Sequence, residues 1–124
     1  MQEIYTNKAP EAIGPYSQAV IVGDYLYASG SIGINPESGE VVEGIEKQTT
    51  QVMENLRTIL QEGNADFSKV AKFTIYLQNM DDFAEVNEIY GRYLSKPYPA
   101  RATVEVSRLP KDVLVEMDVV AYLK

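Results

Sequence analysis

The sequence predicts an α+β fold in which two helices pack on one face of a single mixed β-sheet. Most of its regular segments are short, apolar and rich in β-branched residues, which is typical of strands. Two longer segments instead repeat their apolar residues with helical spacing. Gly, Pro, Asn and Asp gather between these segments, where turns are expected. The predicted order is β-β-β-α-β-α-β-β.

The first three strands are predicted in the N-terminal part of the chain. Residues 3–6 form a short strand, and residues 19–22 are β-branched and apolar. Gly23-Asp24 then predicts a tight turn into residues 25–29, so these two segments form a hairpin.

The central part predicts both helices, with one strand between them. Residues 45–62 place Ile, Thr, Val and Leu on one helical face, and Gly63-Asn64 ends that helix. Residues 70–78 alternate as a strand does. Asp81 is expected to cap a second helix that continues to Leu94.

The C-terminal part predicts two more strands, at residues 101–107 and 113–123. The last strand is apolar on both faces, since Leu114, Val120 and Tyr122 lie opposite its core-facing residues. Two helices cover only one face of a sheet. We therefore expect the other face to pack against another copy of the chain, in a homo-oligomer.

Length and composition limit the possible functions. The 124 residues fit a single domain, residues 1–124, and the net charge of −7 argues against nucleic acid or an anionic membrane as the main partner. Without Cys or His, the chain has no disulfide, thiolate nucleophile or Ser-His-Asp triad, and most transition-metal sites are excluded. With neither a signal peptide nor a run of about 20 apolar residues, a cytoplasmic location is expected.

Two charged residues in the last strands are candidates for chemistry. Arg101 begins a strand, and its planar guanidinium could bind a carboxylate with two hydrogen bonds, although it could equally be a surface residue at a strand end. Glu116 interrupts the most apolar strand, so its carboxylate is either partnered, poised for proton transfer, or at a solvated rim beside Asp118. If the two strands were neighbours, Arg101 and Glu116 could partner each other.

Two loop segments are candidates for binding. Tyr16 follows Gly14-Pro15, a rigid loop that suits a binding site, although the ring could simply pack beneath the loop. Ser29-Gly30 ends a strand, and glycine allows the backbone to approach a ligand closely, although a plain strand exit is the alternative.

These segments occur in an order that closely resembles the RidA/YjgF family of enamine/imine deaminases over essentially the whole chain. The matching motifs are Gly-Pro-Tyr-Ser-Gln-Ala at 14–19, Ser29-Gly30, Pro-Ala-Arg-Ala-Thr-Val-Glu-Val at 99–106, Arg-Leu-Pro-Lys-Asp at 108–112 and Val-Glu-Met at 115–117. The resemblance implies a chorismate-mutase-like homotrimer with a central barrel and sites between subunits. It also implies hydrolysis of 2-aminoacrylate and 2-iminobutanoate to 2-keto acids and ammonia, without a cofactor or metal.

The family's functional residues carry over by position. Arg101 matches the arginine that binds the substrate carboxylate, and Glu116 matches the glutamate that positions water. Tyr16 and Ser29 match the tyrosine and serine of the site, with Gly30 beside the ligand. Thr103 stands at the family's cysteine position, where a backbone carbonyl contributes to the site.

Three departures from the family are visible. Ser31 and Gly33 replace the usual Gln and Pro, Thr103 replaces Cys, and the loop before Pro99 is short. A non-catalytic module of the same fold, regulatory or chaperone-like, that binds small carboxylates is the alternative function. A turnover assay separates the two.

Overall fold

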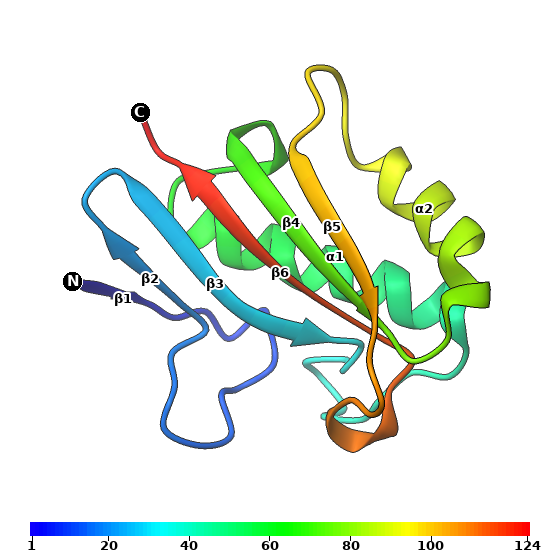
Figure 1. Ribbon diagram of the computed structural model, residues 1–124. Coiled ribbons are helices and arrows are strands. Elements are labelled where there is room, and N and C mark those ends of the chain that lie inside the picture. The colour runs from blue at the N-terminus through cyan, green and yellow to red at the C-terminus, as the bar shows by residue number, and fades with distance from the viewer.

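The computed structural model covers residues 1–124 and confirms the predicted order of elements (Figure 1). One sheet contains the strands β1 (Gln2–Ile4), β2 (Ala19–Val22), β3 (Tyr25–Ile32), β4 (Val70–Leu77), β5 (Ala100–Glu105) and β6 (Val115–Tyr122). The two helices are α1 (Ile45–Glu62) and α2 (Phe83–Arg92).

The sheet is mixed, with the strand order β1-β2-β3-β6-β4-β5. Only β4 and β5 pair in parallel, and α2 is the crossover between them. The last strand of the chain, β6, lies in the middle of the sheet, antiparallel to both β3 and β4. This position suits the most apolar strand, because a central strand has a neighbouring strand along each of its two edges.

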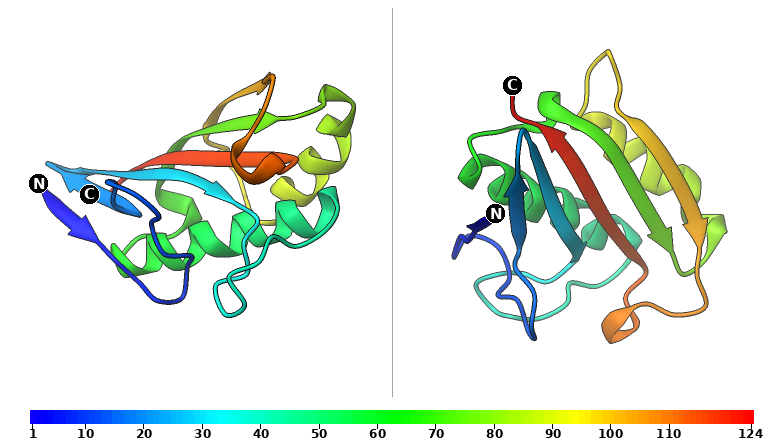
Figure 2. Two further views of the ribbon diagram at one scale, coloured as in Figure 1. Left: turned by 90° about the horizontal axis from the view of Figure 1, so that it is seen from below. Right: turned by 60° about the vertical axis from the view of Figure 1, so that its left-hand side comes forward.

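Both helices lie on the same face of the sheet, as predicted (Figures 1 and 2). The core fills the space between them, and the inward residues of β6 are almost completely buried: Val115, Met117, Val119 and Ala121. On α1 the buried side chains fall at helical spacing and include Val52, Leu56 and Leu60. The apolar period of the sequence therefore places the core correctly.

The bounds of α1 match the sequence prediction, but the start of α2 does not. Asn79, not Asp81, provides the side-chain cap: its Oδ1 accepts a 2.9 Å hydrogen bond from the backbone N–H of Asp81. A short 3₁₀ turn, Met80–Asp82, follows and leads into α2. The predicted cap at Asp81 is wrong because the chain begins to turn two residues earlier.

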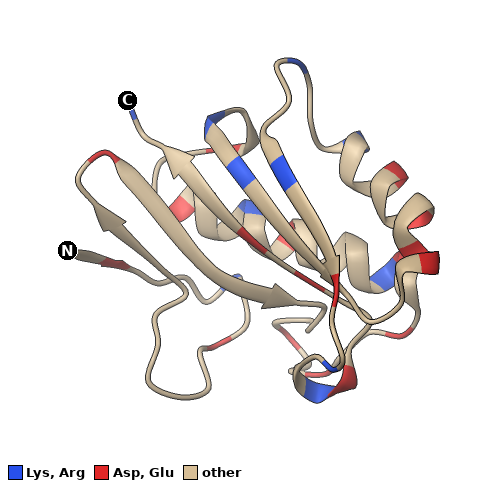
Figure 3. Cartoon of the chain, viewed as in Figure 1, with Lys and Arg blue, Asp and Glu red and all other residues tan.

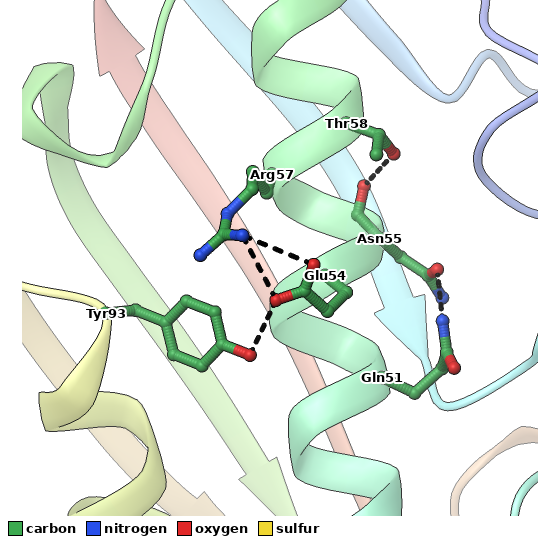
Figure 4. Close-up of polar contacts among 6 residues, drawn as sticks. All are labelled: Gln51, Glu54, Asn55, Arg57, Thr58 and Tyr93. Carbon is green, nitrogen blue, oxygen red and sulfur yellow. Dashed lines mark hydrogen bonds and ion pairs between the residues drawn. The ribbon is translucent and has the colours of Figure 1, made fainter.

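A polar cluster joins the C-terminal end of α2 to α1 (Figure 4). The Tyr93 hydroxyl donates a 2.7 Å hydrogen bond to Glu54, and the Arg57 guanidinium lies 5.0 Å from the centre of the Tyr93 ring. Burial, together with the hydrogen bond to Glu54, raises the pKa of Tyr93 to about 12. Tyr93 therefore stays protonated and keeps donating to α1 throughout the neutral pH range.

The face of the sheet away from the helices, called here the open face, carries large apolar side chains. Tyr25, Tyr27 and Tyr122 lie close together on β3 and β6, with ring centres 6.5 Å and 5.3 Å from that of Tyr25. Val22 and Val104 are also exposed on this face. No helix is long and apolar enough to cross a membrane.

Candidate functional site

A cleft of about 470 Å³ opens beside β3 and β6, and it contains four of the six predicted site residues. Tyr16 comes from the loop between β1 and β2, Ser29 and Gly30 lie on β3, and Glu116 lies on β6. These residues are far apart in the sequence, and the pairing of β3 with β6 brings them together.

Gly30 and Glu116 are in direct contact across the β3–β6 pair. The register of this pair shifts between Ala28 and Ser31, as in a β-bulge. A Cβ atom on residue 30 would lie 2.0 Å from Oε2 of Glu116, closer than any side chain can approach. The glycine is therefore required for the carboxylate to occupy its observed position.

The electrostatic surroundings of Glu116 suit proton transfer. The side chain is half-buried, and burial is the main cause that raises the pKa of Glu116 above its ordinary value. The negative charge of Asp118, two residues along the same face of β6, raises it further. A carboxylate with a raised pKa is a stronger base than a solvated one, which favours proton transfer from water to Glu116.

Ser29 fixes the loop that carries Tyr16. Its hydroxyl donates a 2.6 Å hydrogen bond to the carbonyl of Ser17, and its backbone N–H donates to the carbonyl of Gln18 at 3.0 Å. The Tyr16 hydroxyl accepts a 3.4 Å hydrogen bond from the N–H of Ile13, and half of the Tyr16 side chain is exposed. Ser29 is therefore committed to the loop, whereas Tyr16 is available at the cleft mouth.

Gln18 is a cleft residue to which the sequence analysis gave no role. Its side chain is buried, accepts from the N–H of Thr6 at 2.8 Å, and donates to the carbonyls of Thr6 and Pro10 at 3.0 Å and 2.8 Å. These bonds tie residues 6–10 to the start of β2, and Pro10 of this segment lines the cleft. The available signal was the polar Gln18 directly before an apolar strand, where a buried amide needs partners.

The Arg-Leu-Pro-Lys-Asp segment also contributes to the cleft, through Pro110 and Lys111. The Arg108 guanidinium donates two hydrogen bonds to the Asp112 carboxylate, at 2.7 Å and 3.3 Å. Leu109, the residue after Arg108, is buried. Lys111 and Asp112 both have positive φ, at 55° and 54°, which is unusual for residues other than glycine. The turn places Lys111 at the cleft as its basic lining residue.

Arg101 and Thr103 lie outside this cleft, on β5 at the far edge of the sheet. Arg101 is opposite Phe73 on β4, whereas Glu116 is opposite Tyr76, three residues further along. Strand β4 thus separates Arg101 from Glu116. The suggestion that these two residues partner each other from neighbouring strands is wrong within one chain.

Each of the two β5 candidates has a polar group that lacks one kind of partner within the chain. The Arg101 guanidinium contacts α2 and has no acidic partner within ion-pair distance. Figure 3 shows basic bands side by side on β4 and β5, away from the acidic bands of β6. The hydroxyl of Thr103 is buried without a hydrogen-bond partner. Of the two, the Arg101 guanidinium is exposed, so it can bind an incoming anion.

The cleft thus combines a carboxylate with a raised pKa, a phenol and a close backbone approach, while a guanidinium without an acidic partner lies on β5. No three Asp or Glu side chains gather closely enough to hold a metal ion. The chemistry that this arrangement supports is the binding of a small anion and the activation of water by a carboxylate.

Comparisons with known proteins identify the family of this chain. The family model described as Endoribonuclease L-PSP matches residues 6–123. A RutC family protein of Pyrococcus abyssi is 52% identical over 120 residues, covering 96% of this chain and 94% of that protein. The crystal structure of RidA from Psychrobacter sp. PAMC 21119 is 45% identical with a TM-score of 0.96, covering 98% and 99% of the two chains.

A third similar protein is Escherichia coli TdcF, whose crystal structure contains bound serine. It is 34% identical with a TM-score of 0.96 and covers all of both chains. Because a family model matches almost the whole chain and relatives reach half identity at full coverage, the chain belongs to the Endoribonuclease L-PSP family, together with the RutC and RidA proteins.

Proposed function

We propose that this protein is an enamine/imine deaminase that hydrolyses 2-aminoacrylate- and 2-iminobutanoate-type acids to 2-keto acids and ammonia. The observation that carries the proposal is the half-buried Glu116 carboxylate, which faces the cleft against Gly30 with a raised pKa. Hydrolysis of an imine needs a base for water and a binding group for the substrate carboxylate. It needs no covalent nucleophile, because the C=N carbon is already electrophilic.

In the proposed reaction, the enamine first tautomerises to the imine. Arg101 binds the carboxylate with two hydrogen bonds and thereby orients the C=N bond. Glu116 takes a proton from water as the water oxygen attacks the imine carbon. Proton transfer to nitrogen releases ammonia and leaves the 2-keto acid. Tyr16 covers the bound substrate, and the backbone carbonyl of Thr103 contacts it.

This mechanism requires Arg101 and Glu116 to come from different chains, because β4 separates them within one. We therefore propose a homotrimer in which Tyr16, Ser29, Gly30 and Glu116 of one subunit face Arg101 and Thr103 of the next. The exposed tyrosines and valines of the open face supply an apolar surface for such an assembly. Bound serine in TdcF supports a small amino-acid-like ligand for this family.

Because the substrate is unstable, the test of deaminase activity generates it within the assay mixture. A serine or threonine dehydratase generates the enamine, and keto acid formation is followed with and without this protein. We expect faster keto acid formation. If the protein binds 2-oxobutanoate but does not accelerate the reaction, the non-catalytic carboxylate-binding module is the correct alternative.

A mixing experiment tests the shared site. Arg101→Ala and Glu116→Gln should each be inactive alone, but co-refolded mixtures should regain activity in about a quarter of their sites, which combine an intact Arg101 with an intact Glu116. Light scattering of the unmixed protein should give a trimer mass. A monomer mass at micromolar concentration, or no recovery on mixing, would contradict the shared site.

RNA cleavage, which the family's description names, has less support in this chain. The net charge is −7, and Glu11 and Glu116 line the cleft, so a phosphate backbone would be repelled. Incubation with single-stranded RNA provides the direct comparison, and we expect no cleavage.

A further inference from the structure

The four arginines of this chain have different surroundings. Three of them pair with an acid on their own segment: Arg57 with Glu54, Arg92 with Glu88, and Arg108 with Asp112. Arg101 has no such partner, although acidic residues outnumber basic ones by 18 to 11. The Arg101 guanidinium therefore carries a positive charge that no acidic side chain of the same chain neutralises.

Helix α2 surrounds the Arg101 guanidinium with neutral side chains. Phe83, Asn87 and Tyr90 share one face of the helix, at positions i, i+4 and i+7. The guanidinium carbon lies 5.3 Å from the centre of the Phe83 ring and 5.2 Å from that of Tyr90. The side-chain oxygen of Asn87 accepts a hydrogen bond from Nη1 of Arg101. The two rings and the amide restrict the direction in which the guanidinium can point.

At position 87 an uncharged amide lies beside Arg101, although acidic residues are close to it in the sequence. Glu85 and Glu88 flank Asn87 in the sequence, and neither pairs with Arg101; Glu88 binds Arg92 instead. Aspartate has nearly the same shape as asparagine, but at position 87 it would form an ion pair with Arg101. The guanidinium would then already be neutralised when a carboxylate ligand arrived.

We propose that Asn87 is a positioning residue, whose neutral amide orients Arg101 while leaving its charge free for the substrate carboxylate. This inference rests on the proposed function of Arg101. It extends the site to α2, which α1 holds in place through the Tyr93 hydrogen bond to Glu54 (Figure 4). Asn87 itself is exposed, so its replacement leaves the core intact.

The test compares Asn87→Asp with Asn87→Ala. The alanine variant loses one hydrogen bond and should raise KM about three- to tenfold. The aspartate variant adds a competing charge and should raise KM further, by about 30-fold or more, with a smaller effect on kcat. Binding of 2-oxobutanoate, measured by calorimetry, should weaken in the same order. Gln61→Glu, which adds the same charge on the exposed surface of α1, should change neither quantity.

A role through Arg101 also predicts non-additivity. In an Arg101→Ala background, Asn87→Asp should cause no further loss of 2-oxobutanoate binding, and the thermal stability and trimer mass of every variant should match the unmodified protein. Normal KM in Asn87→Asp, beside an inactive Arg101→Ala, would overturn this inference alone. Normal activity in Arg101→Ala would overturn both this inference and the proposed site. Equal losses with and without Arg101 would show that Asn87 acts elsewhere.

Discussion

The cleft beside β3 and β6 and the Arg101 surface on β5 are built in different ways. In the cleft, each wall is tied down by buried contacts within the chain, such as the Gln18 hydrogen bonds and the Gly30–Glu116 contact. On β5, the Arg101 side chain is exposed, and its contacts are limited to three side chains of α2: Phe83, Asn87 and Tyr90. Changes in the cleft should therefore affect folding and activity together, whereas changes on β5 should affect activity alone.

The largest effect is expected on β5. Arg101→Ala removes the paired hydrogen bonds to the substrate carboxylate and should cost roughly 2–5 kcal/mol, or about 30- to 4000-fold in kcat/KM. Arg101→Lys keeps the charge but loses the planar fork, so it should also be severely impaired. Both should keep the thermal stability of the unmodified protein.

Arg92→Ala is the matched control for Arg101, because it removes an exposed arginine that already has an acidic partner. We expect it to be fully active. An unfolded Arg101→Ala would show that this residue is structural, and near-normal activity would remove it from the site.

In the cleft, Gly30→Ala should cost about 100-fold in kcat, because its Cβ would lie 2.0 Å from Oε2 of Glu116 and displace the base. Some loss of stability should accompany it, since Glu116 is half-buried. Gly91→Ala, in α2 with no atom near the added methyl, is the control and should leave kcat unchanged. Wild-type kcat in Gly30→Ala would mean that Glu116 is not needed where the structure places it.

The pH profile distinguishes the base in the cleft from the charge on β5. The pKa of Glu116 is raised, so its basic form and the activity should be lost on acidification at a pH above the ordinary glutamate value of 4.5. Asp118→Asn removes a negative charge that contributes to this rise, so the acidic limb of kcat/KM should move to lower pH, by less than about 1 unit. An unmoved or upward-shifted limb would show that another group titrates.

The smallest effect is expected at Thr103. If only its backbone carbonyl acts in the site, Thr103→Cys should change kcat/KM less than about twofold. Thr103→Val should be equally active and no less stable, because the hydroxyl is buried without a partner in the chain. A large loss in both variants would show that the side chain participates.

The structural features that the sequence predicts well depend on residues that are close together in the sequence. The apolar period of residues 45–62 sets both ends of α1, and the alternation in β6 identifies its core face, because each pattern reports local geometry. The cap of α2 was misplaced at Asp81 because the residues at 79 and 81 both favour caps, and only the backbone path selects Asn79.

The features that it misses depend on sheet order. Nothing local shows that β4 lies between β5 and β6, so the separation of Arg101 from Glu116 was not foreseen. Gln18 was missed for a similar reason, since two of its partners are backbone groups at Thr6 and Pro10, brought near by the path of a loop. The resemblance predicts six site residues, but their division between the cleft and β5 follows only from the structure.

Gly33 limits how this sequence can change over evolution. A Cβ at position 33 would lie 2.9 Å from the Cα of Gln48, so α1 runs too close to the end of β3 for any larger residue. The Gln48 side chain also accepts a 2.8 Å hydrogen bond from the N–H of Leu114, two residues before Glu116. A side chain at position 33 would push α1 outward and disturb the strand that carries Glu116. Because the close contact is with the backbone of Gln48, no substitution at position 48 relieves it, and this chain keeps glycine at position 33 for as long as α1 keeps its place against the sheet.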